Sequence, residues 1–277
     1  MRVNWIIAIF VGLTDSSSRL RQILWRWVYN IIAKSDAAGN FLFMNYGYID
    51  EHQTPIPLNR EDEVYRHYIQ LYNHVVEDVD LQNKAILEVG CGRGGGGAFL
   101  LRYKNPRSYI GLDLSEKSID WCKQQFQFPH ADWKQGSADN LPFPDNSFDV
   151  VVNVESSHCY PSMEKFLGEV KRVLGPNGYF AYCDMRRNSG LAALEKAIKT
   201  SGLKILKEDE ITIQVLRGLD QASSKRDTEV TSVFHPIFQR TFRTFAGVKD
   251  TEVYNMLKKG QMKYFSCLLQ KNRPEES

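Results

Sequence analysis

The chain has 277 residues, 43% hydrophobic and 25% charged, so it can bury a substantial core as one domain. Its net charge is only +2, and Lys and Arg form no dense run, so no nucleic-acid partner is expected. The five cysteines contain no C-x-x-C pair, which argues against a disulfide framework or a zinc site. The sequence therefore predicts a cytoplasmic protein without a metal.

Residues 1–80 are predicted to form an N-terminal helical cap. Residues 5–11 are apolar but too few to span a bilayer, and no cleavage site typical of a signal peptide follows them. Residues 19–32 place apolar side chains at helical spacing opposite a basic face. This pattern is typical of a helix that packs on the core, covers an apolar pocket or makes peripheral contact with a membrane. An aromatic segment, 41–48, precedes a second expected helix at 61–78.

From residue 84 the pattern alternates strand and helix, which predicts an α/β fold with a Rossmann-like, doubly wound, mostly parallel seven-stranded sheet. Strands are expected at 84–90, 108–113, 132–136, 148–154, 178–184, 203–211 and 263–270, and helices at 95–104, 115–126, 162–174 and 189–200. The stretch 212–262 is too long for a connection and is predicted to be a helical cap inserted in the core, residues 81–277.

A glycine-rich run follows the first strand and predicts a cofactor cradle. Residues 90–97 contain six glycines, which allow positive φ values and close approach of the main chain to a ligand. The run also satisfies G-x-G-x-x-G, with Asp113 at the end of the next strand, as in nicotinamide or flavin enzymes. Glu88 just before the run favours a different cofactor, because a carboxylate suits an ammonium group and not a pyrophosphate.

Four blocks in order resemble the class I S-adenosylmethionine-dependent methyltransferases: residues 88–94, 111–115, 136–149 and 169–178. The resemblance implies S-adenosylmethionine as cofactor, with its methionine part near Gly90 and Gly92, its ribose on Asp113, and its adenine between Ser137 and Ala138. Ser137 stands where the family usually has Asp. The predicted cofactor-binding set is Glu88, Gly90, Cys91, Gly92, Asp113, Leu114, Ser137, Ala138 and Asn153.

The candidate catalytic residues, Glu155 and His158, follow the fourth strand and are expected at the mouth of the sheet. A neutral imidazole at His158 can take the proton of a substrate hydroxyl, because its usual pKa of about 6.5 suits base catalysis at neutral pH. Alternatively, His158 only hydrogen-bonds within its loop, and catalysis comes from alignment of the reactants. Glu155 either orients His158 or caps the loop.

Residues 155–161, 43–48 and 254–264 narrow the resemblance to O-methyltransferases of the phthiotriol and phenolphthiotriol dimycocerosate type and related antibiotic O-methyltransferases. This implies methylation of a hydroxyl on an apolar small molecule, such as a lipid, a polyketide or a related secondary metabolite. An acidic residue three positions before a histidine also resembles sterol and prenyl C-methyltransferases, in which a carboxylate and aromatic rings would stabilise a carbocation. A further alternative is a non-catalytic scaffold that binds a membrane or a partner through residues 5–32.

Overall fold

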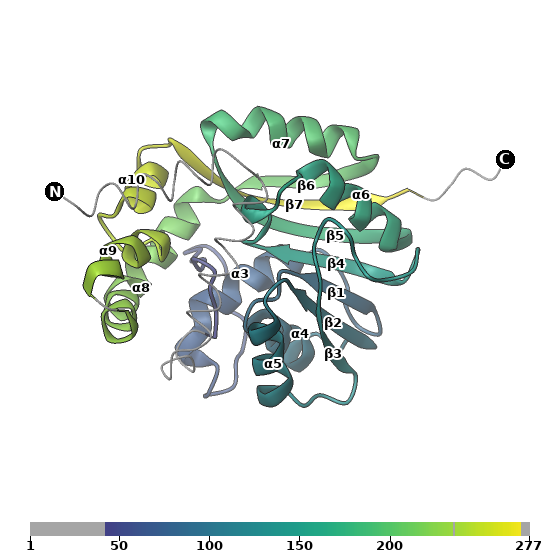
Figure 1. Cartoon of the computed structure of the whole chain (residues 1–277), viewed down its shortest axis with the longest axis horizontal. Helices are drawn as coiled ribbons and strands as arrows, with labels where there is room; N and C mark the ends of the chain where they lie inside the picture. Colours follow the sequence, from purple (N-terminus) through teal and green to yellow (C-terminus); the bar gives the residue numbers. More distant parts are fainter. Residues whose placement is uncertain (1–41, 235, 273–277) are drawn as a thin grey trace.

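The computed structural model describes residues 42–234 and 236–272, with a seven-stranded sheet at its centre (Figure 1). The strand order is β3-β2-β1-β4-β5-β7-β6. The strands are β1 Ala85–Val89, β2 Ser108–Asp113, β3 Ala131–Gln135, β4 Phe148–Val154, β5 Leu174–Arg187, β6 Leu203–Glu210 and β7 Met262–Lys271. The apolar segment 5–11 and the amphipathic segment 19–32 lie outside the described residues.

The sheet is parallel from β3 to β5, and β7 runs antiparallel to both of its neighbours, β5 and β6. All residues of β1 are buried, as expected for a central parallel strand covered on both faces. The predicted Rossmann-like, mostly parallel sheet is therefore confirmed, with a mixed edge. Because the order reverses at β1, between β2 and β4, ligands are expected beyond the carboxyl ends of these strands.

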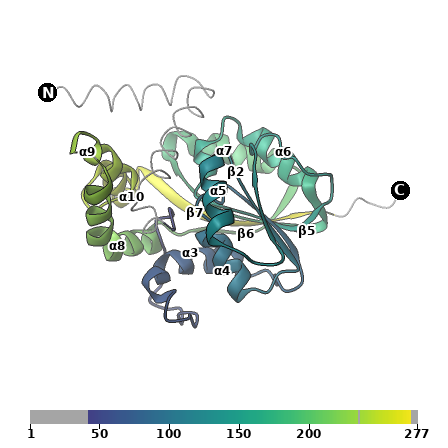
Figure 2. The ribbon, with the colours of Figure 1, turned by 60° about the horizontal axis from the view of Figure 1, so that its bottom comes forward.

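Helices cover both faces of the sheet (Figure 2). Side chains alternate along β1, so Ile86 packs in the core cluster with α3 and α4, and Leu87 packs in the cluster with α6 and α7. By the same alternation Glu88 lies on the face of Ile86. The helices are α3 Arg66–Val76, α4 Gly95–Tyr103, α5 Glu116–Gln125, α6 Met163–Val173 and α7 Asn188–Thr200, with short 3-10 turns η2 Glu63–Tyr65 and η3 Ser157–Cys159.

The fifth strand differs from the sequence-based expectation. It begins at Leu174, which pairs with Phe148, four residues before the expected start at residue 178. The pairing register then shifts before Tyr179, and Asn177 has a φ of +62°. Residues 175–178 thus form an irregularity inside β5, because their turn conformation is compatible with strand pairing before and after them.

Helices α8 Thr212–Val233, α9 Pro236–Phe245 and α10 Glu252–Lys258 lie together at one end of the molecule (Figure 1). They fill the sequence between β6 and β7, where helices were expected. The chain returns from α10 directly into β7, so these helices are anchored at both ends to the antiparallel edge of the sheet. Of the helices described here, none has both the length and the apolar character needed to cross a membrane.

Candidate active site

The glycine-rich loop, residues 90–94, joins β1 to α4 at the carboxyl edge of the sheet. Gly90 has a φ of +78°, and a Cβ at this position would lie 2.3 Å from Oγ of Ser156. Gly92 has a φ of +54°, and a Cβ there would lie 2.4 Å from Cε of Met44. The backbone conformation therefore favours glycine at both positions, and at Gly90 the space beside Ser156 does so as well. The loop presents bare main chain where other residues would place side chains.

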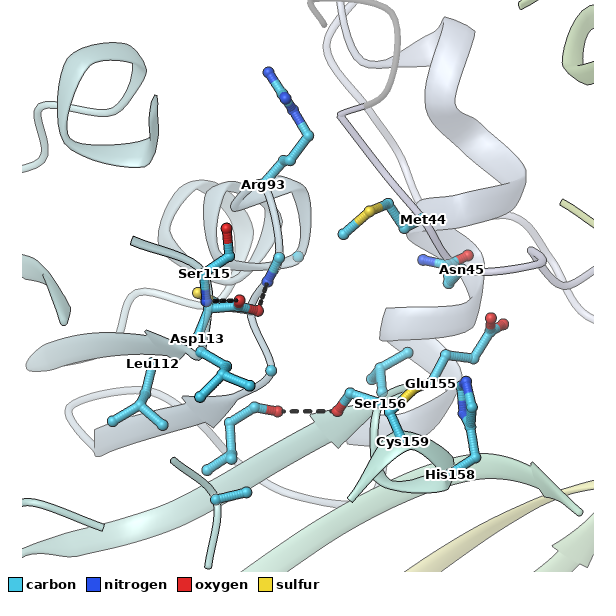
Figure 3. Close-up of a pocket in the computed structure, with 18 of the residues that line it drawn as sticks. Met44, Asn45, Arg93, Leu112, Asp113, Ser115, Glu155, Ser156, His158 and Cys159 are labelled. Atoms are coloured by element: carbon cyan, nitrogen blue, oxygen red, sulfur yellow. Dashed lines mark hydrogen bonds between the residues drawn. The ribbon is translucent and has the colours of Figure 1, made fainter. Parts of the chain in front are cut away.

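Asp113 ends β2 next to this loop and fixes its position (Figure 3). Its Oδ2 accepts a hydrogen bond from the Gly92 N–H at 2.9 Å, and its Oδ1 accepts one from the Ser115 N–H at 2.8 Å. Burial raises the pKa of Asp113, although these backbone donors oppose the shift. Each carboxylate oxygen still has a lone pair for a further donor, so Asp113 can accept two ligand hydroxyls.

Ser137 follows β3 and lies in the same cavity as Leu114 and Ala138. Its Oγ donates to Oδ1 of Asp139 at 2.5 Å. The hydroxyl therefore has its proton committed to a carboxylate two residues away, and its oxygen can accept from an amine. A contact of Ser137 with the adenine stays a prediction.

Glu88 lies behind the loop and is fully buried. Its Oε1 accepts from the Tyr72 hydroxyl at 2.7 Å, and its Oε2 accepts from the Tyr109 hydroxyl at 2.5 Å. Burial raises the pKa of Glu88 to about 7, against the lowering effect of the two tyrosines. Glu88 does not line the cavity. Tyr72, which donates a hydrogen bond to it, does line the cavity. A direct contact of Glu88 with the cofactor stays a prediction.

Asn153, on β4, is also fully buried and lies behind residues that line the cavity. Its Nδ2, which carries two hydrogens, lies within hydrogen-bond distance of three acceptors: the Val89 carbonyl at 2.8 Å, Ser156 Oγ at 2.7 Å and the Tyr160 hydroxyl at 2.9 Å. Ser156 and Tyr160 reach the cavity, whereas Asn153 does not line it. Asn153 thus joins the end of β1 to the loop after β4.

His158 is held by Asp184, at the carboxyl end of the parallel part of the sheet. Its Nδ1 lies 2.7 Å from Oδ1 of Asp184, and its backbone N–H donates to Oδ2 at 2.8 Å. Asp184 is fully buried and forms an ion pair with Arg186 at 3.0 Å. Burial opposes the charged imidazole, yet Cys159 and Asp184 raise the pKa of His158 well above its usual value. The ring is therefore oriented by Asp184, and Glu155 makes no hydrogen bond to it.

Glu155 has a φ of +48°, which is uncommon for a residue with a side chain. Its Oε1 accepts from the Tyr46 N–H and from the Tyr264 hydroxyl, both at 2.5 Å. Burial raises the pKa of Glu155 to about 7, although these donors lower it. Glu155 thus connects the loop after β4 to the segment 42–46 and to β7. Such a held backbone conformation at a cavity wall is typical of functional sites.

These residues surround a cavity of about 1150 Å³ at the carboxyl edge of the sheet. In Figure 3, Asp113 and Ser115 lie on one side of it, and Glu155 and His158 lie on the other, with Met44 above them. All the predicted site residues line the cavity except Glu88 and Asn153.

Comparisons with known proteins decide the family. Residues 87–182 match the family model of a methyltransferase domain. The chain is 40% identical over 250 residues to a phthiotriol/phenolphthiotriol dimycocerosates methyltransferase of Mycobacterium tuberculosis, which covers 90% of this chain and 92% of the relative. This chain belongs to that methyltransferase family. A fatty-acid O-methyltransferase of Mycolicibacterium smegmatis is 38% identical, over 79% of this chain and 77% of the relative.

A solved structure shares the fold of this methyltransferase. It is the geranyl diphosphate C-methyltransferase from Streptomyces coelicolor A3(2) in complex with Mg²⁺, geranyl diphosphate and S-adenosyl-L-homocysteine. The TM-score is 0.61 at 17% identity, over 88% of this chain and 98% of the other. These comparisons confirm the predicted fold and enzyme class. They favour a methyltransferase over a nicotinamide-dependent enzyme and over a non-catalytic scaffold.

Several residues in or directly behind the wall of the methyltransferase cavity were not found from the sequence. Asp184 could have been, because Val154 at the end of β4 pairs with Cys183, which places Asp184 beside the loop that carries His158. Met44 had no such signal, since its place at Gly92 depends on packing between distant segments. Arg93 is 2% exposed and stacks 4.0 Å above the Trp121 ring, and burial lowers its pKa to about 10.

Proposed function

We propose that this enzyme transfers a methyl group from S-adenosylmethionine to a hydroxyl oxygen of a lipid or a related apolar small molecule. The relatives support the acceptor class, because their names describe dimycocerosates and fatty acids as substrates. The aromatic residues on the cavity wall also support an apolar acceptor: Phe43, Tyr46, Tyr72, Tyr160 and Phe245.

The residues of the cavity fit the cofactor. S-adenosylmethionine supplies an electrophilic methyl group on a positively charged sulfur. The bare main chain at Gly90 and Gly92 leaves room for its amino-acid part, and the carboxylate of Asp113 can accept two ribose hydroxyls. Ser137 and Ala138 line the same cavity beyond Asp113 and are assigned to the adenine.

The observation that carries O-methylation is the pairing of His158, which lines the cavity, with the fully buried Asp184. Asp184 holds Nδ1, so we assign Nε2 to the proton of the substrate. In the transfer, the acceptor oxygen bonds to the methyl carbon, the carbon–sulfur bond breaks, and the hydroxyl proton passes to Nε2 of His158. Because the pKa of His158 is raised, formation of the neutral base requires a higher pH than for an ordinary histidine, and the rate is expected to rise with pH.

We also propose that residues 1–80 and 212–262 act as caps that exclude water from the site. In the described part, the Tyr46 hydroxyl donates to the Phe245 carbonyl at 2.9 Å. Arg226 of α8 donates to the carbonyls of Asn45 and Ala246 at 2.6 and 2.5 Å. These bonds join the two segments at the mouth of the cavity, where closure would favour charge-dependent chemistry.

C-methylation is the second candidate, and Glu155 favours it. Its carboxylate lies at the wall of a cavity lined by aromatic rings, and a carboxylate with such rings can stabilise a developing carbocation. In that case His158 would position the substrate and would not act as the base for a hydroxyl.

Product analysis separates the two candidates. The enzyme is incubated with lipid, polyketide and sterol acceptors and with S-adenosylmethionine that carries a carbon-13 methyl group. Mass spectrometry finds the product, and carbon-13 NMR assigns the label to an oxygen-bound or a carbon-bound methyl. A carbon-bound label in every product would overturn O-methylation.

Calorimetry with S-adenosylhomocysteine tests the cofactor assignment separately. The Asp113→Ala variant is expected to bind at least about tenfold more weakly, because charge-assisted hydrogen bonds to two hydroxyls are lost. Asp132→Ala is the matched control, since Asp132 is half exposed and outside the cavity. Equal affinity of both variants would contradict the role of Asp113.

A further inference from the structure

A second cavity, of about 530 Å³, lies between α8, α9 and the segment 42–44. It shares three lining residues with the first cavity: Phe43, Met44 and Phe245. The two cavities are therefore neighbours separated by these side chains. Among the partition residues Met44 is the most adaptable, because its side chain is unbranched and its thioether fits irregular spaces. Its Cε already rests against Gly92 of the glycine-rich loop.

Aromatic side chains make up half of the residues that line the second cavity. The rings of Phe234 and Phe242 stack at 3.6 Å, and the ring of Phe43 stacks on that of Tyr68 at 5.7 Å. Val230 and Ala246 complete the apolar lining. Such a surface gains free energy from contact with hydrocarbon and offers few partners to water.

The charged groups on this wall do not suit an anionic ligand. Arg226 is 6% exposed, and both of its terminal nitrogens donate to backbone carbonyls, of Asn45 and Ala246. Glu229 is 9% exposed, and burial raises its pKa, although Lys225 lies 3.9 Å away. A buried carboxyl group would repel an anion or take up a proton, so an uncharged ligand is favoured.

We propose that the second cavity holds the uncharged alkyl chain of the methyl acceptor, while the reacting group lies beside His158 in the first cavity. The inference rests on the proposed function, because the acceptor must reach both cavities. The chain would pass the partition at Met44 and Phe245 and end between α8 and α9. The occupant is thus a linear apolar segment, such as a fatty acyl chain, attached to the group that is methylated.

Chain-length dependence of binding tests this placement without any need for turnover. Saturated fatty acids of about 6 to about 16 carbons are titrated into the enzyme in the presence of S-adenosylhomocysteine, below their aggregation concentrations, by calorimetry. With the wild-type enzyme, each added methylene that is buried is expected to raise the affinity about fourfold, until the chain fills the second cavity.

Two substitutions fill the second cavity from different walls: Ala246→Phe after α9 and Val230→Phe on α8. Each is expected to make the affinity level off at shorter acids, while the affinity for S-adenosylhomocysteine and for the shortest acids stays within about twofold. Two variants are used because Val230 is 1% exposed, and a larger side chain there can weaken folding. Ala193→Phe, on the exposed face of α7, is the matched control and should keep the wild-type profile.

An affinity that does not depend on chain length, or an unchanged profile in folded Ala246→Phe, would refute the placement of the chain. This result is distinct from failure of the proposed function. If no acceptor gains a labelled methyl while the length profile shifts as expected, the alkyl site stands and the assigned reaction falls.

Discussion

The two sides of the cavity are held together by different kinds of contact. On the glycine-loop side, comprising residues 90–94, Asp113 and 136–138, the positions are set by backbone conformation and by main-chain hydrogen bonds between adjacent strands. On the cap side, comprising residues 42–46, Glu155, His158 and Phe245, they are set by side chains from distant segments. Glu155, for example, binds the Tyr46 N–H and the Tyr264 hydroxyl, each 109 positions away.

This difference indicates on which side of the cavity amino-acid substitutions are tolerated. The glycine-loop side depends on the main chain, so a single added methyl group disrupts it, and its residue types are narrowly constrained. The cap side depends on a set of side-chain contacts that other side chains could replace. A family with one cofactor and many acceptors is expected to keep the first and vary the second.

The largest effect is expected on the glycine-loop side, from Gly90→Val. The added side chain would overlap Ser156, and the φ of +78° disfavours a branched residue. We expect the affinity for S-adenosylhomocysteine to fall by more than about a hundredfold, as measured by calorimetry. Gly168→Ala on α6 is the control, because a Cβ there meets nothing within 4 Å. It should bind normally and be stabilised by about 0.5–1 kcal/mol.

The next effect separates chemistry from binding on the cap side. His158→Ala is expected to lower kcat by about 10² to 10⁴, with unchanged affinity for S-adenosylhomocysteine, because it removes the base and leaves the glycine-loop side intact. An unchanged kcat would show that alignment alone drives the transfer.

Asp184→Asn sharpens the same test through the pH profile. Asp184 is one of the groups that raise the pKa of His158, so replacing its charge should let His158 lose its proton at lower pH. The pH at which kcat reaches half its maximum is therefore expected to move down. Asp132→Asn is the exposed control. A profile that does not move would remove His158 as the titrating group.

A smaller effect is expected where the caps meet. Arg226→Met removes the hydrogen bonds to the carbonyls of Asn45 and Ala246, which lie 181 and 20 positions away in the sequence. We expect KM for the acceptor to rise about tenfold and the melting temperature to fall, since buried carbonyls lose charge-assisted donors. The affinity for the cofactor product should not change. Arg107→Met, at a 65% exposed side chain, is the control. A loss of cofactor affinity would mean that the two sides are coupled.

The same contrast explains how much could be predicted from the sequence. The order of strands and helices was readable, because each element is a local pattern, and Asp113 was placed by its position at a strand end. The role of Asp184 and the packing of Met44 on Gly92 were not, because they depend on side chains brought together by the fold. Glu88 was expected to face the cofactor, but the sequence does not show that Tyr72 and Tyr109 occupy its oxygens.

A last effect, on stability alone, compares one buried carboxyl group from each region. Burial raises the pKa of Glu155 on the cap side and of Glu88 behind the glycine-rich loop to about 7, whereas an unfolded chain has a value of about 4.3. The folded state thus binds the proton more tightly. Each protonated carboxyl group therefore stabilises the folded state. This contribution is complete below about pH 4 and is lost as the pH rises to about 7.

Urea unfolding at about pH 5 and about pH 8 measures this loss. For each of Glu155→Gln and Glu88→Gln, we compare the free energy of unfolding with that of the wild type at both pH values. The difference should favour the variant by roughly 2 to 3 kcal/mol more at about pH 8 than at about pH 5. If only Glu88→Gln shows this gain, Glu155 is ionised in the folded enzyme without cost, and the Tyr46 and Tyr264 donors outweigh its burial. A carboxylate that stays charged on the cap side would then be available to stabilise a cation, which would strengthen C-methylation against O-methylation.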